Sequence, residues 1–141
     1  MSDMESGVTV DFLILADAAQ KQSDKLYMLG GGWSAVWAAE FPVNHQLAVA
    51  AGILVPWMET NHRHQFRIRL RGEDGSSFGE LGGEFEQGRP PGLPPGSTQR
   101  VIITVNMTVR FEKPVEAAAD LLIDGNVVKT VPFRVMQRPK R

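Results

Sequence analysis

Residues 65–71 read Gln-Phe-Arg-Ile-Arg-Leu-Arg, an alternation of apolar and cationic side chains. Successive side chains of a β-strand point to opposite faces of the sheet, so this period of two predicts a strand. We expect Phe66, Ile68 and Leu70 to face the core and the intervening arginines to face outward. The stretch therefore indicates a sheet with one buried face and one polar face.

Short apolar runs separated by turn residues continue over the whole chain. Strands are predicted over residues 8–19, 25–29, 45–55, 65–71, 77–86, 100–111, 115–123 and 127–136. In the first, one face carries Val8, Val10, Phe12 and Ile14, and the other carries Leu13 and Leu15. Asp124-Gly125 is a strong two-residue hairpin signal between the last two strands. Many short strands with regular turns predict a sandwich or a barrel.

Two segments do not fit this pattern. The apolar spacing over residues 33–41 suits either a helical turn or an irregular strand. Residues 88–97 read Gly-Arg-Pro-Pro-Gly-Leu-Pro-Pro-Gly-Ser, and a central strand cannot tolerate the missing donors of four prolines. We therefore expect a connecting loop there. Within it, Pro91-Gly92-Leu93-Pro94 has the minimal PxxP spacing that polyproline-recognition domains bind.

The predicted fold is all-β: an antiparallel β-sandwich of about seven to nine strands, immunoglobulin-like or with a similar Greek-key arrangement. A chain of 141 residues fits one domain. We expect a disordered N-terminal tail over residues 1–7, a single sandwich domain over 8–136 and a basic C-terminal tail over 137–141.

Composition narrows the classes of function. The chain has no cysteine, and its 15 basic and 16 acidic side chains give a net charge of -1. A near-neutral surface exerts no global attraction on nucleic acid or anionic lipid, so a nucleic-acid partner is not expected. Residues 1–7 lack the features of a signal peptide, and no apolar stretch approaches the ~20 residues of a membrane span. These features predict a cytoplasmic protein without membrane contact.

Histidines near the 65–71 strand suggest a metal site. His62 and His64 are two residues apart and so share a strand face, and with His45 or Glu59 they form a three-ligand set for zinc or iron. A cupin places two histidines in this way before a glutamate, but residues 65–70 contain no carboxylate. The alternative is that both histidines cap the edge of the core or bond loop carbonyls. The metal set would support a metal-dependent enzyme on a small barrel.

The outward face of the same strand forms a cationic row of Arg63, Arg67, Arg69 and Arg71. Such a row suits an anion or a nucleic-acid backbone. The competing interpretation is cross-strand ion pairing with Glu80, Glu84 and Glu86, on the segment expected to return beside it. We favour the ion pairs, because the returning segment supplies carboxylates at matching spacing.

The leading hypothesis is a non-enzymatic binding or assembly module without a cofactor, because the nucleophile-elbow, Walker, dinucleotide and zincin motifs are all absent. We expect an unidentified protein partner, with self-association into a homodimer through a strand edge or a sheet face as a further possibility. The recognition surface is predicted to comprise Trp57, Glu59, Asn61, His62, His64, Arg89 and Leu93.

Two strings carry a family resemblance. Val-Asp-Phe-Leu-Ile-Leu-Ala-Asp at 10–17, followed by Lys-Leu-Tyr-Met-Leu-Gly-Gly-Gly-Trp at 25–33, resembles the start of an uncharacterised bacterial family of small stand-alone proteins, classed as a domain of unknown function. Residues 56–61 and 88–97 resemble the rest of its pattern, from about Val8 to Val135. The resemblance implies a bacterial cytosolic β-sandwich and supplies no catalytic residues.

Overall fold

A computed structural model describes residues 7–139, and the predicted N-terminal tail lies outside this range except for Gly7. Within these residues, nine strands and one short 3-10 helix follow each other. They are β1 (Thr9–Gln22), β2 (Lys25–Gly31), β3 (Ala35–Ala38), β4 (Val43–Val55), η1 (Trp57–Glu59), β5 (Arg63–Gly72), β6 (Ser77–Glu86), β7 (Gln99–Phe111), β8 (Val115–Ile123) and β9 (Asn126–Gln137). No helix within residues 7–139 is long and apolar enough to cross a membrane.

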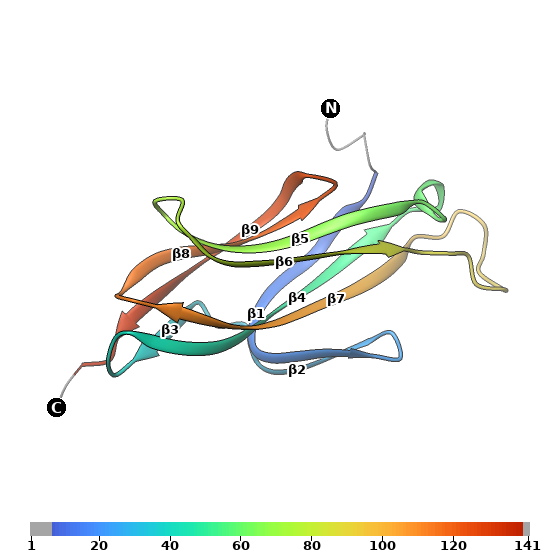
Figure 1. The fold of residues 1–141 in the computed structure, drawn as a ribbon. Coiled ribbons are helices and arrows are strands. Elements are labelled where there is room, and N and C mark those ends of the chain that lie inside the picture. The colour runs from blue at the N-terminus through green and yellow to red at the C-terminus, as the bar shows by residue number, and fades with distance from the viewer. Residues whose placement is uncertain (1–6, 140–141) are drawn as a thin grey trace.

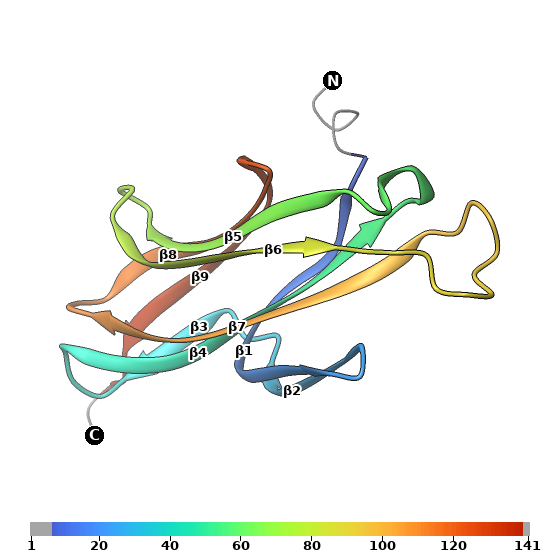
Figure 2. The same cartoon turned by 45° about the vertical axis from the view of Figure 1, so that its right-hand side comes forward.

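The strands form two packed sheets, which confirms the predicted β-sandwich (Figure 1; Figure 2). One sheet has the order β2-β1-β4-β7 and the other β3-β9-β8-β5-β6. All neighbouring strands are antiparallel except β3 and β9, which are parallel. Five connections pass between the sheets, so elements distant in sequence meet at the ends of the sandwich.

The inward faces of both sheets form a continuous apolar core. On β5, Ile68 and Leu70 are fully buried and Phe66 packs beside them, as the alternation predicted. On β4 the inward row runs from Leu47 to Val55. Apolar area removed from water is the main favourable term in folding, so these rows fix which face of each strand is buried.

The first strand departs from the predicted faces. A register shift between Val10 and Phe12 inserts a bulge into the β1–β4 ladder. A bulge moves the following side chains to the opposite face, so Leu13 enters the core and Phe12 packs over Gly52 on the outside. The prediction that Phe12 and Ile14 share a face with Val8 was therefore wrong.

The segment 33–41 contains a strand, not a helical turn. Ala35–Ala38 pairs in parallel with the last residues of β9, and Val36 and Ala38 are buried. This pairing extends β9 to Gln137, one residue into the predicted C-terminal tail, and the amide of Arg138 donates to the carbonyl of Ala38 at 2.7 Å. The helical alternative fails because a parallel partner strand satisfies the backbone groups of this segment.

The second half of β1 pairs with β2, and this two-stranded ribbon packs on the outer face of β4 and β7. Ala16, Ala19, Ala48 and Ala50 form a second buried cluster there, with Leu26 and Met28 packed against it. The side-chain amide of Asn106 on β7 holds the ribbon, accepting from the Ala19 amide at 3.2 Å and donating to the Ala19 carbonyl at 2.7 Å. Alanines allow two backbone layers to approach this closely, because only small side chains separate them.

Candidate functional site

Three connections meet near one end of the sandwich: η1 after β4, the β8–β9 hairpin, and the loop between β6 and β7. We call residues 88–97 the proline loop. Figure 1 shows the proline loop as the most projecting part of this end. The amide of Asn61 donates to the carbonyl of Gln87 at 2.7 Å, which joins the segment after η1 to the base of the proline loop.

Arg89 clamps the proline loop onto η1. Its guanidinium carbon lies 3.9 Å from the centre of the Trp57 ring, a cation–π contact. Its Nε donates to the hydroxyl of Thr60 at 2.6 Å, and its Nη2 donates to the carbonyl of Trp57 at 2.9 Å. The Thr60 hydroxyl also donates to that carbonyl at 2.6 Å. Because one planar guanidinium both stacks and donates twice, the loop and η1 form one unit.

The proline loop is built from two consecutive β-turns, so its PxxP segment is not a polyproline helix. The Leu93 amide donates to the Pro90 carbonyl at 3.1 Å, and the Ser97 amide donates to the Pro94 carbonyl at 3.2 Å. Each turn has Pro and then Gly at its centre, and the glycines at 92 and 96 have φ of 88° and 82°. This is the type II pattern, in which proline presets one dihedral and glycine supplies the positive one.

His64 lies between two carboxylates under this surface. Its side chain is 6% exposed, its ring stacks on Phe85, and its Nδ1 lies 2.7 Å from Oδ2 of Asp124. Its Nε2 lies 3.2 Å from Oε1 of Glu59, but the alignment does not make a hydrogen bond, and this nitrogen has no partner in the structure. The Asp124 carboxylate also accepts the Gln65 amide at 2.9 Å. The cluster thus ties β5, η1 and the β8–β9 hairpin together.

The electrostatics of Asp124 follow from these contacts. Partial burial alone would raise the pKa of its carboxyl group. Hydrogen bonds from His64 and from the Gln65 amide, together with the charge on His64, lower this pKa by more, so the net pKa lies below its ordinary value. The carboxylate form of Asp124 is therefore the one that fits this site.

The proposed metal ligands are not brought together as a set, since only His64 and Glu59 of the four lie side by side. His45 is the third residue of β4 and Glu59 follows its end, so ten residues of strand, about 33 Å, separate His45 from Val55. His62 lies before β5 and is exposed. Among residues 7–139, no three His, Cys, Asp or Glu side chains are grouped to hold a metal ion. The buried His64 has a carboxylate beside each ring nitrogen, which leaves no lone pair directed at an open site.

The arginine row is occupied by ion pairs. Arg63 pairs with Glu84 and Glu86 at 3.8 and 3.9 Å, and Arg67 pairs with Glu80 at 3.1 Å, in agreement with the predicted cross-strand pairing. Arg69 and Arg71 instead bind Asp120 on β8, which sequence reasoning missed. The signal was present: Asp120 is the lone acid in the apolar run 117–123, on the face opposite the core residues.

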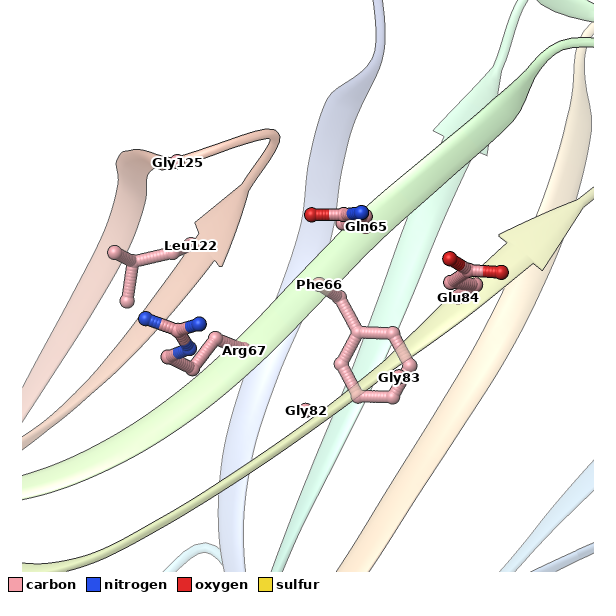
Figure 3. Close-up of a pocket in the computed structure, with 8 residues that line it drawn as sticks. All are labelled: Gln65, Phe66, Arg67, Gly82, Gly83, Glu84, Leu122 and Gly125. Atoms are coloured by element: carbon pink, nitrogen blue, oxygen red, sulfur yellow. The ribbon is translucent and has the colours of Figure 1, made fainter.

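A shallow hollow lies on the outer face of the five-stranded sheet. Its lining residues are Gln65, Phe66, Arg67, Gly82, Gly83, Glu84, Leu122 and Gly125 (Figure 3). Gly82 pairs with Arg67 in the β5–β6 register, and its missing side chain opens the hollow. Since Arg67 is already bound to Glu80, the hollow has no free cation of its own to attract an anion.

Trp57, Glu59, Asn61, His64 and Arg89 thus lie at one end of the sandwich. Their contacts run through Thr60, Gln87 and Asp124, which were not predicted. The model of a family described as "Family of unknown function (DUF6941)" matches residues 11–136 of this chain. No curated protein matches it. The match covers most of the chain and gives no activity, so the function has to be inferred from the site.

Proposed function

The chain belongs to the DUF6941 family of unknown function, and from the geometry of its site we propose that it is a non-enzymatic module that binds a protein partner through the surface formed by η1 and the proline loop. The observation that carries the proposal is the Arg89 clamp on Trp57 and Thr60. A projecting loop held this firmly is already in one conformation before a partner arrives.

Preorganisation favours binding because ordering a loop costs conformational free energy. The two type II turns, the Arg89 clamp and the side-chain bond between Gln87 and Gln99 at 2.9 Å all restrict the proline loop. A second bond, from Gln99 to the Gly88 carbonyl at 2.8 Å, closes its base. A partner would therefore meet a fixed shape and not have to order about ten residues.

The chemistry of the surface suits a protein partner. Met58 is 78% exposed at the centre of η1, next to Trp57, and Leu93 is half-buried in the proline loop. Methionine adapts to irregular apolar contacts, and tryptophan and arginine are enriched among the residues that dominate binding energy. The proline and glycine residues of the loop add no charge of their own to this surface.

Catalysis is less well supported by the same residues. His64 is the only histidine of the cluster, it is buried, and Asp124 and Glu59 lie beside its two nitrogens. A general base needs access to the proton it removes. The cluster instead has the contacts of a support for the binding surface, since it fixes the strand that follows η1.

The proposal is tested by affinity capture with the tagged chain from an extract of the source cells. Met58→Glu and Leu93→Glu place a charge on the surface, and Val127→Glu makes the same change at an exposed residue of the β8–β9 hairpin. We expect a protein retained by the parent chain and by Val127→Glu to fall at least about tenfold with Met58→Glu or Leu93→Glu, as for loss of a residue central to an interface. Retention that is equal for all four chains, or absent for the parent, would overturn the proposal.

A further inference from the structure

The two sheets have four terminal strands, and three of them are protected against pairing with another chain. An exposed strand edge is a template for association, and proteins protect such edges with charge, glycine distortion, shortness or cover. β3 has four residues, and β6 carries Glu80, Glu84 and Glu86 with glycines between them. β7 lies next to β6 of the other sheet, because Gly79 on β6 approaches Met107 on β7. The cover that protects the β7 edge is therefore β6. The remaining edge is β2.

β2 lacks the acidic charge and the cover of the other edges, and its glycines, of which Gly30 has φ of 59°, stand only at its end. Its residues 25–31 read Lys-Leu-Tyr-Met-Leu-Gly-Gly, with one charged side chain at the start and neither acid nor proline. Leu26 and Met28 pack on the alanine cluster and hold the strand against the sheet. Tyr27 and Leu29 point the other way and are 54% and 73% exposed. The strand is therefore anchored on one face and apolar on the other.

The hairpin determines which backbone groups of β2 face the free edge. Ser23 and Asp24 have φ of 52° and 62°, a two-residue turn in which the flanking Gln22 and Lys25 form a hydrogen-bonded pair. Alternation then makes the pair Ala19–Met28 a non-hydrogen-bonded one. The Ala19 backbone indeed bonds away from β2, to Asn106. The N–H and C=O of Met28 accordingly point to the free edge, as do those of Leu26.

We propose that the β2 edge pairs with β2 of a second copy of this chain, antiparallel about a two-fold axis at Met28. Met28 is the central residue of the seven in β2, and its backbone groups face the edge, so a Met28–Met28 pair is hydrogen-bonded. In this register Tyr27 lies opposite Leu29 of the second copy, and the pair occurs twice. These are close, non-hydrogen-bonded positions, where an aromatic and an aliphatic side chain pack well.

Charge and continuity favour a second copy as the occupant. The two Lys25 residues stand at opposite ends of the shared ladder, about 20 Å apart, so like charges do not meet. The β2-β1-β4-β7 sheets of the two copies would join into one continuous sheet.

Sedimentation over a concentration series tests the pairing. The parent chain is expected to reach twice its 15.5 kDa mass. Leu29→Lys should raise the dimer dissociation constant at least about tenfold, because lysine then faces Tyr27 at two symmetric positions. Leu81→Lys, an equivalent change on the exposed face of β6, should leave it unchanged. A parent chain that stays monomeric, or equal constants for the two variants, would refute the proposal. Unchanged circular dichroism of Leu29→Lys shows that its fold is intact.

The register has its own test, because the chain contains no cysteine. Chains carrying Tyr27→Cys and Leu29→Cys are oxidised separately and as an equal mixture. The proposed register puts position 27 opposite position 29, so the mixture should form a covalent dimer of unlike chains in preference to either like pair. Equal yields for like and unlike pairs would exclude this register. Neither result depends on the surface at η1, so this inference and the proposed function can fail independently.

Discussion

Replacement of Asp120 by asparagine should destabilise the fold by more than any other change to its polar residues. The Asp120 side chain is 1% exposed, yet it lies on the outward face of β8. Arg69 donates to it at 3.1 and 2.9 Å, Arg71 at 2.7 and 3.3 Å, and Thr130 at 2.7 Å. Asparagine keeps the shape but removes the charge and presents an amide to donors.

The magnitude follows from the pKa of Asp120. Burial alone would raise this pKa, but the hydrogen bonds from Arg71, Thr130 and Arg69 and the charge on Arg71 lower it by more, from 3.8 to about 2. This difference corresponds to about 2 kcal/mol of folding free energy. Arg69 and Arg71 are about one-third exposed and regain water when the charge is lost, so the cost stays below the roughly 3–5 kcal/mol of a fully buried pair. We expect about 2–3 kcal/mol at neutral pH.

The loss must also depend on pH in a defined direction. A carboxyl group whose folded pKa is depressed contributes its full stability above its unfolded pKa, and this contribution disappears as pH falls through the folded value. The difference between the parent and Asp120→Asn should therefore be constant above about pH 5 and shrink between about pH 4 and pH 2.

Urea unfolding at a series of pH values measures this difference, provided the slope of free energy against urea is the same for both proteins. Glu80→Gln is the matched control, because Glu80 is an acid on the same outer face and its ion pair with Arg67 is exposed to solvent. This control should cost less than about 1 kcal/mol of folding free energy. A cost for Asp120→Asn equal to that of the control, or one that persists undiminished at pH 2, would refute the reasoning.

Three further changes test other contacts. A double-mutant cycle of His64→Gln and Asp124→Asn should give a coupling free energy of about 1–3 kcal/mol, because the His64 and Asp124 side chains are 2.7 Å apart and part-buried. Additive losses of stability in urea unfolding would contradict this contact. Arg89→Lys keeps the charge but loses the planar stack on Trp57, so amide hydrogen exchange in the proline loop should accelerate about tenfold while exchange in the core strands stays slow. An unchanged exchange rate in the loop would argue against the clamp. Gly52→Ala should cost about 1–3 kcal/mol in thermal unfolding, since the added Cβ would clash with the Phe12 ring. Adding Phe12→Ala to the same chain should recover part of that loss, and no recovery would show that this clash is not the cause.

Local pattern was sufficient for most of the strands but not for every face. The alternation in 65–71 placed Ile68 and Leu70 in the core, and Asp124-Gly125 marked the last hairpin. Phe12 was assigned to the wrong face because a bulge depends on pairing with β4, which alternation along β1 does not contain. Residues 33–41 were ambiguous for a related reason, since their strand exists only through its pairing with β9.

The candidate site was only partly accessible from the sequence. The residue types at 57–64 and in the proline loop pointed to residues that the structure brings together, because tryptophan and histidine supply contact groups and a proline-rich run stiffens a loop. The stack of Arg89 on Trp57 joins residues 32 positions apart, and the contact of His64 with Asp124 joins residues 60 apart. No periodicity links such positions, because the contacts depend on the order of strands in the sheets.

From the sequence alone it follows that this protein is a β-sandwich, that its strands other than β3 begin and end within a few residues of their observed bounds, and that strand 65–71 has one apolar and one cationic face. These properties follow from the period of side chains along a single strand and from local turn chemistry. Only the tertiary structure shows that Asp120 neutralises Arg69 and Arg71, that His45 lies far from Glu59, and that β2 is a terminal strand of its sheet. Each of these depends on which strands are neighbours, and strand order is set by packing of the whole core.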